Sequence, residues 1–121
     1  MELATAARRF LAHLAAERGA AAATLAAYTR DLRKYQEFCG QRGLDAITPA
    51  DLATFRDGLV AGGLTMASAA RTMAAVRGLH RFAALEGWTA LDAAAQVAPP
   101  RPSRRLPKAL TLAEVEALIE A

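Results

Sequence analysis

Residues 24–39 read TLAAYTRDLRKYQEFC, and this stretch decides the fold class. At about 100° per residue, one side of a helix collects its apolar and aromatic side chains: Leu25, Tyr28, Leu32, Tyr35, Phe38 and Cys39. The opposite side carries Arg30, Arg33 and Lys34. The pattern therefore predicts a helix over about residues 22–41, with one face in a core and a basic face in solvent.

Three further main helices are predicted from apolar periodicity and from glycines at their ends. They cover about residues 2–18, 48–61 and 65–87. The strongest start signal is TPAD at 48–51, which offers an N-cap threonine, a proline at the first helical position and an acid in the first turn. A short fifth helix is expected over 91–97.

Composition supports an all-α class. Hydrophobic residues make up 54% of the 121 residues, and alanine, the best helix former, supplies about half of them. The single cysteine excludes an intrachain disulfide and fits a reducing compartment. No apolar run approaches the ~20 residues of a membrane span, so a cytoplasmic protein without a membrane partner is expected. The predicted fold is an orthogonal bundle of four main helices, followed by the short fifth helix, a basic linker and a terminal helix.

The linker is predicted from a change in composition. Residues 98–108 hold four prolines and four basic residues, which is typical of an extended segment. A capping-box pattern then starts an amphipathic helix at Thr111, and its apolar stripe needs a second domain to pack on. The predicted division is a first helical domain over 1–98, an extended linker over 99–110 and the first helix of a truncated second domain over 111–121.

The distribution of charge points to an anionic partner. The net charge is +3, but residues 65–108 carry seven basic and two acidic side chains, or +5, which leaves −2 for the rest. Thirteen of the 15 basic residues are arginines, whose planar donors suit phosphates and guanine edges. A genome bias toward GC-rich codons explains that number equally well, so the placement of the charges has to decide.

The fourth predicted helix shows that placement. Arg71, Arg77 and Arg81 are predicted to lie opposite its apolar arc, without an acidic residue among them. Ala75 and Gly78 are predicted to lie between them and to let the helix axis approach a partner closely. Basic faces on two helices and a basic linker favour duplex DNA as the partner.

Candidates for catalysis or metal binding are poor. His13 and His80 lie far apart in sequence, and neither has a cysteine or carboxylate at metal-ligand spacing. His80 is predicted at the edge of the core, and Tyr35 and Cys39 within it. Neither a catalytic residue, a cofactor nor a metal is expected in this chain.

Three blocks of the sequence resemble a known family. The run from Thr24 to Leu32 looks like the T-x-x-x-Y-x-x-D-L signature of the N-terminal, SAM-like core-binding domain of tyrosine recombinases. The segment 68–77 resembles the fourth helix of that domain, and 106–115 resembles the junction into the catalytic domain. The blocks occur in the family's order and spacing, and the likeness is greatest to Xer-type recombinases and related integrases.

The resemblance implies half of a C-shaped clamp around a recombination site, with the second and fourth helices facing the major groove. Carried over position by position, the implied DNA contacts are Thr24, Arg30, Ser68, Arg71 and Arg77. Charge placement adds Arg33, Lys34, Arg81, Arg101, Arg104, Arg105 and Lys108. The implied partners are double-stranded DNA, the catalytic domain of the same parent chain and other recombinase protomers. The family's catalytic groups are expected beyond Ala121, so this chain alone is not expected to cleave DNA.

Two departures and two alternatives remain. A proline that the family often has near the short helix is missing at 91–93, and Gly78 stands where relatives often have a basic or larger residue.

The chain is alternatively a helical protein-interaction module for recombinase assembly, in which case an exposed apolar stripe should dominate its surface. A third possibility is that the chain retains catalysis.

Overall fold

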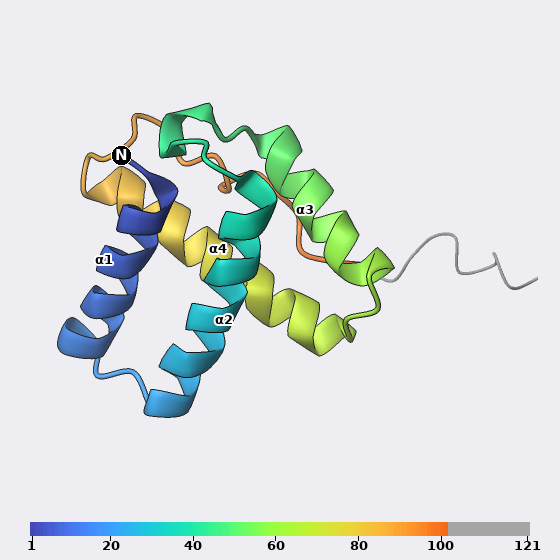
Figure 1. Cartoon of the computed structure of the whole chain (residues 1–121), viewed down its shortest axis with the longest axis horizontal. Helices are drawn as coiled ribbons and strands as arrows, with labels where there is room; N and C mark the ends of the chain where they lie inside the picture. The colour runs from blue at the N-terminus through green and yellow to red at the C-terminus, as the bar shows by residue number, and fades with distance from the viewer. Residues whose placement is uncertain (102–121) are drawn as a thin grey trace, which may run out of the picture.

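The structure is a computed structural model that describes residues 1–101 (Figure 1). Within this range it contains four α-helices and a short 3₁₀ helix: α1 Leu3–Glu17, α2 Ala22–Cys39, η1 Leu44–Ala46, α3 Pro49–Ala61 and α4 Met66–Leu85. The four predicted main helices are confirmed, each to within a few residues at its ends. The predicted terminal helix and most of the predicted linker lie outside the described residues.

Side-chain caps fix the starts of α3 and α4. At α3 the predicted capping box forms: Asp51 N–H donates to Thr48 Oγ1 at 3.1 Å, and Thr48 N–H donates to Asp51 Oδ2 at 2.9 Å. At α4, Ser68 N–H donates to Thr65 Oγ1 at 3.1 Å. These bonds satisfy backbone groups that a helix leaves free at its first turn.

Helix α4 is the central element, because α1, α2 and α3 all pack against it. Figure 1 shows α2 crossing in front of α4, with α1 and α3 on either side. One side of α4 is almost fully buried and includes Ala69, Thr72, Met73, Ala75, Val76, Leu79, His80 and Ala83. The alanines in this set have short side chains, so they let neighbouring helices pack close to the α4 axis.

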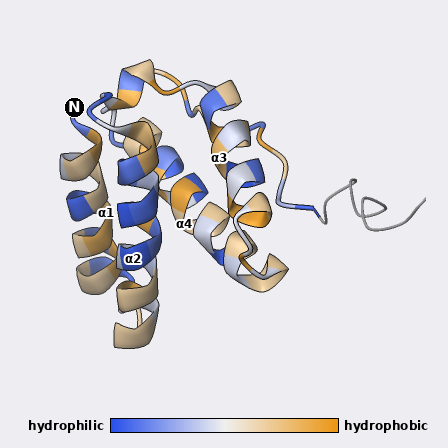
Figure 2. Ribbon diagram, turned by 45° about the vertical axis from the view of Figure 1, so that its right-hand side comes forward, coloured by the Kyte–Doolittle hydropathy of each residue, from blue (hydrophilic) through white to orange (hydrophobic). Residues whose placement is uncertain are grey.

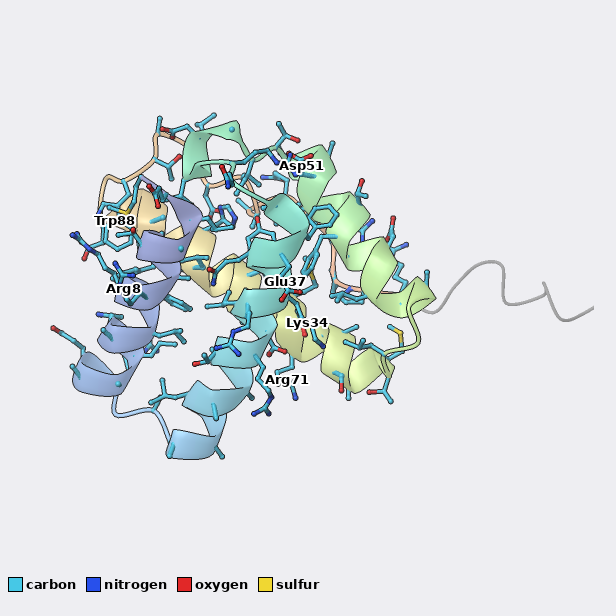
Figure 3. All side chains as sticks on the ribbon, in the orientation of Figure 1. Arg8, Lys34, Glu37, Asp51, Arg71 and Trp88 are labelled. Carbon is cyan, nitrogen blue, oxygen red and sulfur yellow. The ribbon has the colours of Figure 1, made fainter. Side chains whose placement is uncertain are left out.

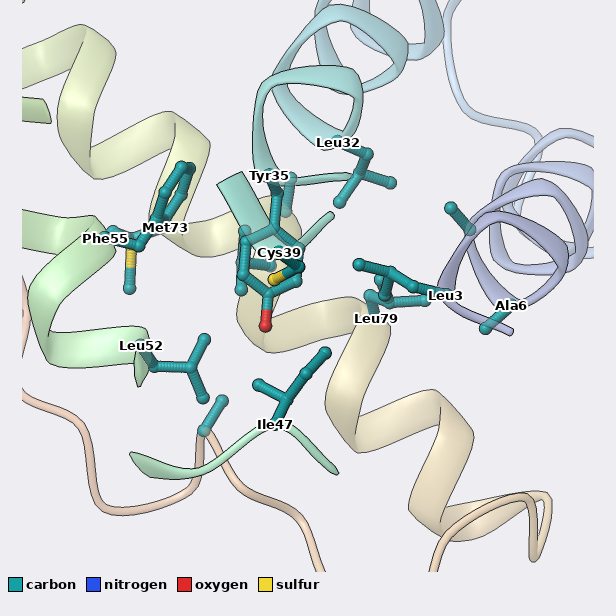
Figure 4. Packing of buried hydrophobic residues seen from close by; sticks show 14 of the residues in the cluster. Leu3, Ala6, Leu32, Tyr35, Cys39, Ile47, Leu52, Phe55, Met73 and Leu79 are labelled. Carbon is teal, nitrogen blue, oxygen red and sulfur yellow. The ribbon is translucent and has the colours of Figure 1, made fainter. Parts of the chain in front are cut away.

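Tyr35 of α2 lies at the centre of the core (Figure 4). Its ring packs on Phe55 of α3, with ring centroids 5.1 Å apart, and against His80 of α4 at 5.7 Å. Cys39 is buried beside it, as predicted for a small core residue. Phe38 differs from its prediction: it is partly exposed and packs on Phe55 from outside.

Gly78 and Ala75 of α4 do not face a partner, so their predicted role is wrong. Ala75 is fully buried. A Cβ placed on Gly78 would lie 2.9 Å from Cζ of Phe10, because α1 covers this part of α4. Gly78 therefore allows α1 and α4 to pack closely, and neither small residue is available to a ligand.

The segment after α4 folds into turns where a short fifth helix was expected. Its bonds run from Ala95 N–H to the Asp92 carbonyl and from Val97 N–H to the Ala94 carbonyl. The Asp92 carboxylate also accepts from Ala94 N–H at 3.0 Å, as at a helix start, but the backbone bonds that follow span three residues and not the four of an α-helix. Beyond these turns, Arg56 of α3 donates to the Ala98 carbonyl at 3.1 Å and fastens the segment to α3.

Candidate nucleic-acid interface

The outward face of α2 is basic. Arg30, Arg33 and Lys34 are exposed on it, opposite the buried side that carries Leu32 and Tyr35. Figure 2 shows the hydrophilic turns of α2 in blue, and Figure 3 shows Lys34 with Glu37, the one acid exposed on this helix. Across residues 1–101, basic side chains form ion pairs only at Arg42, Arg56 and Arg71. The three cations of α2 therefore keep their charge available to a ligand.

The arginines of α4 do not form the single face that the sequence predicts. Arg77 and Arg81 lie one turn apart on the solvent side, where Arg81 is exposed and Arg77 half-buried. Arg71 lies six residues before Arg77, which turns it about 120° away around the helix axis, toward α2. The prediction of three arginines on one arc is wrong, because Arg71 belongs to the crossing between α2 and α4.

At that crossing, Arg71 forms a two-point ion pair with a buried carboxylate. Arg71 Nε donates to Asp31 Oδ2 and Arg71 Nη2 donates to Asp31 Oδ1, both at 2.9 Å. The Thr72 hydroxyl donates to Asp31 Oδ1 at 2.9 Å and also lies 3.0 Å from the Ser68 carbonyl oxygen. The hydrogen bonds that Arg71 donates to Asp31 raise the pKa of Arg71 above its ordinary value. Arg71 is therefore not the free cation that the charge pattern suggested.

Asp31 lies inside the family signature, but sequence reasoning gave it no role. A signal was present, because Asp31 falls on the buried side of α2 between the aromatic residues Tyr28 and Tyr35. A carboxylate at such a position requires a cation or several hydrogen bonds. The partner could not be chosen from the sequence, since it lies 40 residues away on another helix.

The remaining predicted contacts are spread over the ends of the elements. Thr24 is exposed in the first turn of α2, and Ser68 is half-buried in the first turn of α4. Arg101 is exposed and is the last described residue. Arg104, Arg105 and Lys108 lie outside the described residues, so their contact with DNA stays a prediction.

His80 lies inside the core, and its predicted place at the core edge is wrong. Its side chain is buried, and Nε2 forms a hydrogen bond of 2.7 Å with the Tyr35 hydroxyl. Burial lowers the pKa of His80 below 6.5, so the imidazole is neutral near pH 7. Within residues 1–101 no group of three His, Cys, Asp or Glu side chains could hold a metal ion. Nor is any helix in this range both long and apolar enough to span a bilayer.

Comparison with known proteins identifies the family. Residues 7–87 match the family described as phage integrase, N-terminal SAM-like domain. The chain therefore belongs to the phage integrase family through this N-terminal domain, as its sequence blocks predicted.

The curated relatives are tyrosine recombinases. Tyrosine recombinase XerD of Mycobacterium tuberculosis is 48% identical over 121 residues, a match that covers 92% of this chain and 39% of the relative. XerD of Corynebacterium glutamicum is 42% identical over 123 residues, covering 95% and 40%. XerC of Pseudomonas entomophila is 42% identical over 105 residues, covering 84% and 35%. The chain thus spans about two fifths or less of the length of these relatives.

A solved structure shows the same fold. The crystal structure of a lambda integrase dimer bound to a COC′ core site matches with a TM-score of 0.75 and 23% sequence identity. The match covers 87% of this chain and 36% of the integrase chain. The all-α bundle predicted from the sequence is thereby confirmed as the integrase N-terminal fold.

Proposed function

We propose that this chain binds duplex DNA as the N-terminal core-binding domain of a tyrosine site-specific recombinase. The observation that carries the proposal is the basic face of α2, where Arg30, Arg33 and Lys34 are exposed and unpaired within the described part of the chain. Membership of a family whose relatives are named recombinases, and the fold shared with a DNA-bound integrase, support it.

The chemistry of that face fits the sugar–phosphate backbone. Each cation that meets a phosphate releases condensed counterions, so affinity depends steeply on salt and little on sequence. Arg77, Arg81 and Arg101, exposed or half-exposed, are further phosphate ligands in this proposal, together with Thr24 and Ser68 at the helix starts. The linker cations Arg104, Arg105 and Lys108 would extend the contact along the duplex.

The whole recombinase would act through groups outside this chain. We infer that a catalytic domain of the same parent protein forms the tyrosyl-phosphate bond, that protomers assemble on the recombination site, and that this takes place in the cytoplasm. Residues 1–121 alone are then expected to bind duplex without cutting it. A strand-cleavage assay with supercoiled and nicked substrates tests this, and any covalent protein–DNA product formed by the chain would contradict it.

Salt-dependent binding tests the DNA assignment directly. Fluorescence anisotropy with a random duplex of about 30 base pairs, from about 50 to about 200 mM salt, gives the slope of log K against log salt. The combined change Arg30→Ala, Arg33→Ala and Lys34→Ala should reduce that slope by about 0.9 for each phosphate that is no longer neutralised.

A control triple on α1 removes the same charge from another surface. Arg8 and Arg9 of α1 and Arg18 at its C-cap are exposed, so changing all three to alanine alters the net charge equally. The control triple should retain most of the slope of log K against log salt. Equal slopes for the two triples would mean that only net charge matters, and the α2 face would lose its assignment.

The alternative, an assembly module, has less support in the described residues. An exposed apolar stripe was its expected mark. The exposed large hydrophobic side chains of residues 1–101 are Met1, Phe38, Leu85 and Leu91, which belong to different segments. No single helix face in this range collects them, whereas α2 does collect three cations.

A further inference from the structure

We propose that Asp31 is a positioning residue for Arg71, and that it holds the guanidinium so that its free edge reads a guanine in the duplex. The inference rests on the proposed DNA-binding function and refines it. It assigns one residue to sequence recognition and takes that residue out of the set that contacts phosphate.

The first step is the orientation of the guanidinium. Asp31 occupies the side edge of Arg71, since its two oxygens accept from Nε and Nη2 at 2.9 Å each. Two parallel bonds to a planar group fix both its position and its plane. Thr72 in turn fixes the carboxylate through its hydroxyl at 2.9 Å. The fork is therefore set before any ligand arrives, which lowers the entropy cost of binding.

Second, Asp31 leaves the end of the Arg71 guanidinium free to bind a ligand. A guanidinium has five N–H donors in a rigid plane, and Asp31 uses two of them. One N–H on each terminal nitrogen then points away along the end of the side chain. The Asp31 side chain is 1% exposed, whereas that of Arg71 is 42% exposed. Figure 3 shows Arg71 at the open side of the crossing between α2 and α4.

The third step is the choice of acceptor. The buried carboxylate cancels the charge of Arg71, so the pair offers a phosphate much less attraction than Arg33 or Lys34 does. The pair keeps its two parallel N–H donors, and these match the O6 and N7 acceptors of guanine in the major groove. A neutralised but oriented fork therefore suits a base edge better than the phosphate backbone.

Selection from a pool of duplexes with a randomised centre tests the proposal. The chain with its natural sequence should enrich one guanine position by roughly 10-fold or more over the other bases. Arg71→Ala and Asp31→Asn should both lose that preference. The slope of log K against log salt should stay unchanged in Arg71→Ala, while Arg33→Ala lowers it by about 0.9.

Leu79→Ala controls for a merely structural role. It opens a cavity at a buried position of α4 about two turns beyond Arg71, so it lowers stability but should keep the guanine preference. Circular dichroism at the binding temperature shows that each variant is folded, and Arg71→Lys serves if Arg71→Ala is not. Lysine keeps the charge but lacks the fork, so it should also lose the preference.

Several results would overturn the proposal. They are a guanine preference that survives in Arg71→Ala or Arg71→Lys, a natural chain that binds without any base preference, and a salt slope that falls in Arg71→Ala as in Arg33→Ala. The last would place Arg71 on a phosphate. Failure of the natural chain to bind any duplex at low salt would instead overturn the proposed function itself.

Discussion

Asp31 and Arg71 show what a buried charge does in a small helical protein. The carboxylate is removed from water between α2 and α4, and it accepts three hydrogen bonds of 2.9 Å each. Burial of this kind is tolerated only when the charge is paired. The pair therefore joins two helices at a defined point, whereas apolar side chains tolerate sliding.

A double-mutant cycle measures this joint. Arg71→Met leaves a buried carboxylate without its cation and should lower the free energy of unfolding by about 2–4 kcal/mol. The double change Asp31→Leu with Arg71→Met removes both charges and should cost much less than the two single changes together. Urea unfolding followed by circular dichroism gives all four values. Additive losses would show that the two side chains are energetically independent.

His80 makes the stability depend on pH. Burial keeps its pKa below 6.5 in the folded chain, whereas the unfolded chain takes up the proton near 6.5. The unfolded state therefore binds more protons as the pH falls below this value, and folding loses stability there. The melting temperature should fall between about pH 7 and about pH 5, before most carboxylates titrate.

Two histidine variants separate this effect from other titrations. His80→Gln should melt lower at pH 7 but lose much of the pH dependence in that window, because glutamine does not titrate. His13→Gln, which changes the half-buried histidine of α1, should keep it. Identical pH profiles for both variants would contradict the buried, neutral state of His80.

At the scale of elements, the packing of α1 on α4 depends on a missing side chain. Gly78 lies in the interior of α4, where glycine costs about 1 kcal/mol relative to alanine. The cost is offset because Phe10 occupies the space that a Cβ would need. Sequence reasoning found the glycine but assigned it to a ligand, since periodicity does not show which neighbouring helix covers a face.

A pair of glycine substitutions tests this contact. Gly58 in α3 has nothing within 4 Å of a built Cβ, so Gly58→Ala should stabilise the protein by about 0.5–1 kcal/mol. Gly78→Ala should gain less or destabilise, because Phe10 must move. Phe10→Leu shortens the neighbouring side chain. Adding Gly78→Ala to the Phe10→Leu chain should therefore raise its stability. Thermal denaturation of the four chains checks this, and equal gains at both glycines would contradict the close packing.

For the molecule as a whole, the sequence predicted the class and the helices well and the site less well. Helix positions follow from local signals such as the Thr48–Asp51 capping box, which needs only neighbouring residues. The exposure of Arg30, Arg33 and Lys34 follows from the period of one helix. The pairing of Asp31 with Arg71 and of Tyr35 with His80 depends on how helices cross, and such long-range contacts have no local signature.

The outward face of α2 is the surface that we expect to meet the duplex. A titration of the ¹⁵N-labelled chain with a short duplex, followed by backbone amide chemical shifts, tests this residue by residue. We expect the largest changes around Arg30, Arg33 and Lys34, with further changes near Arg71 and little at Arg8 on α1. Shifts concentrated on α1 or α3, with the amides of α2 unmoved, would contradict it.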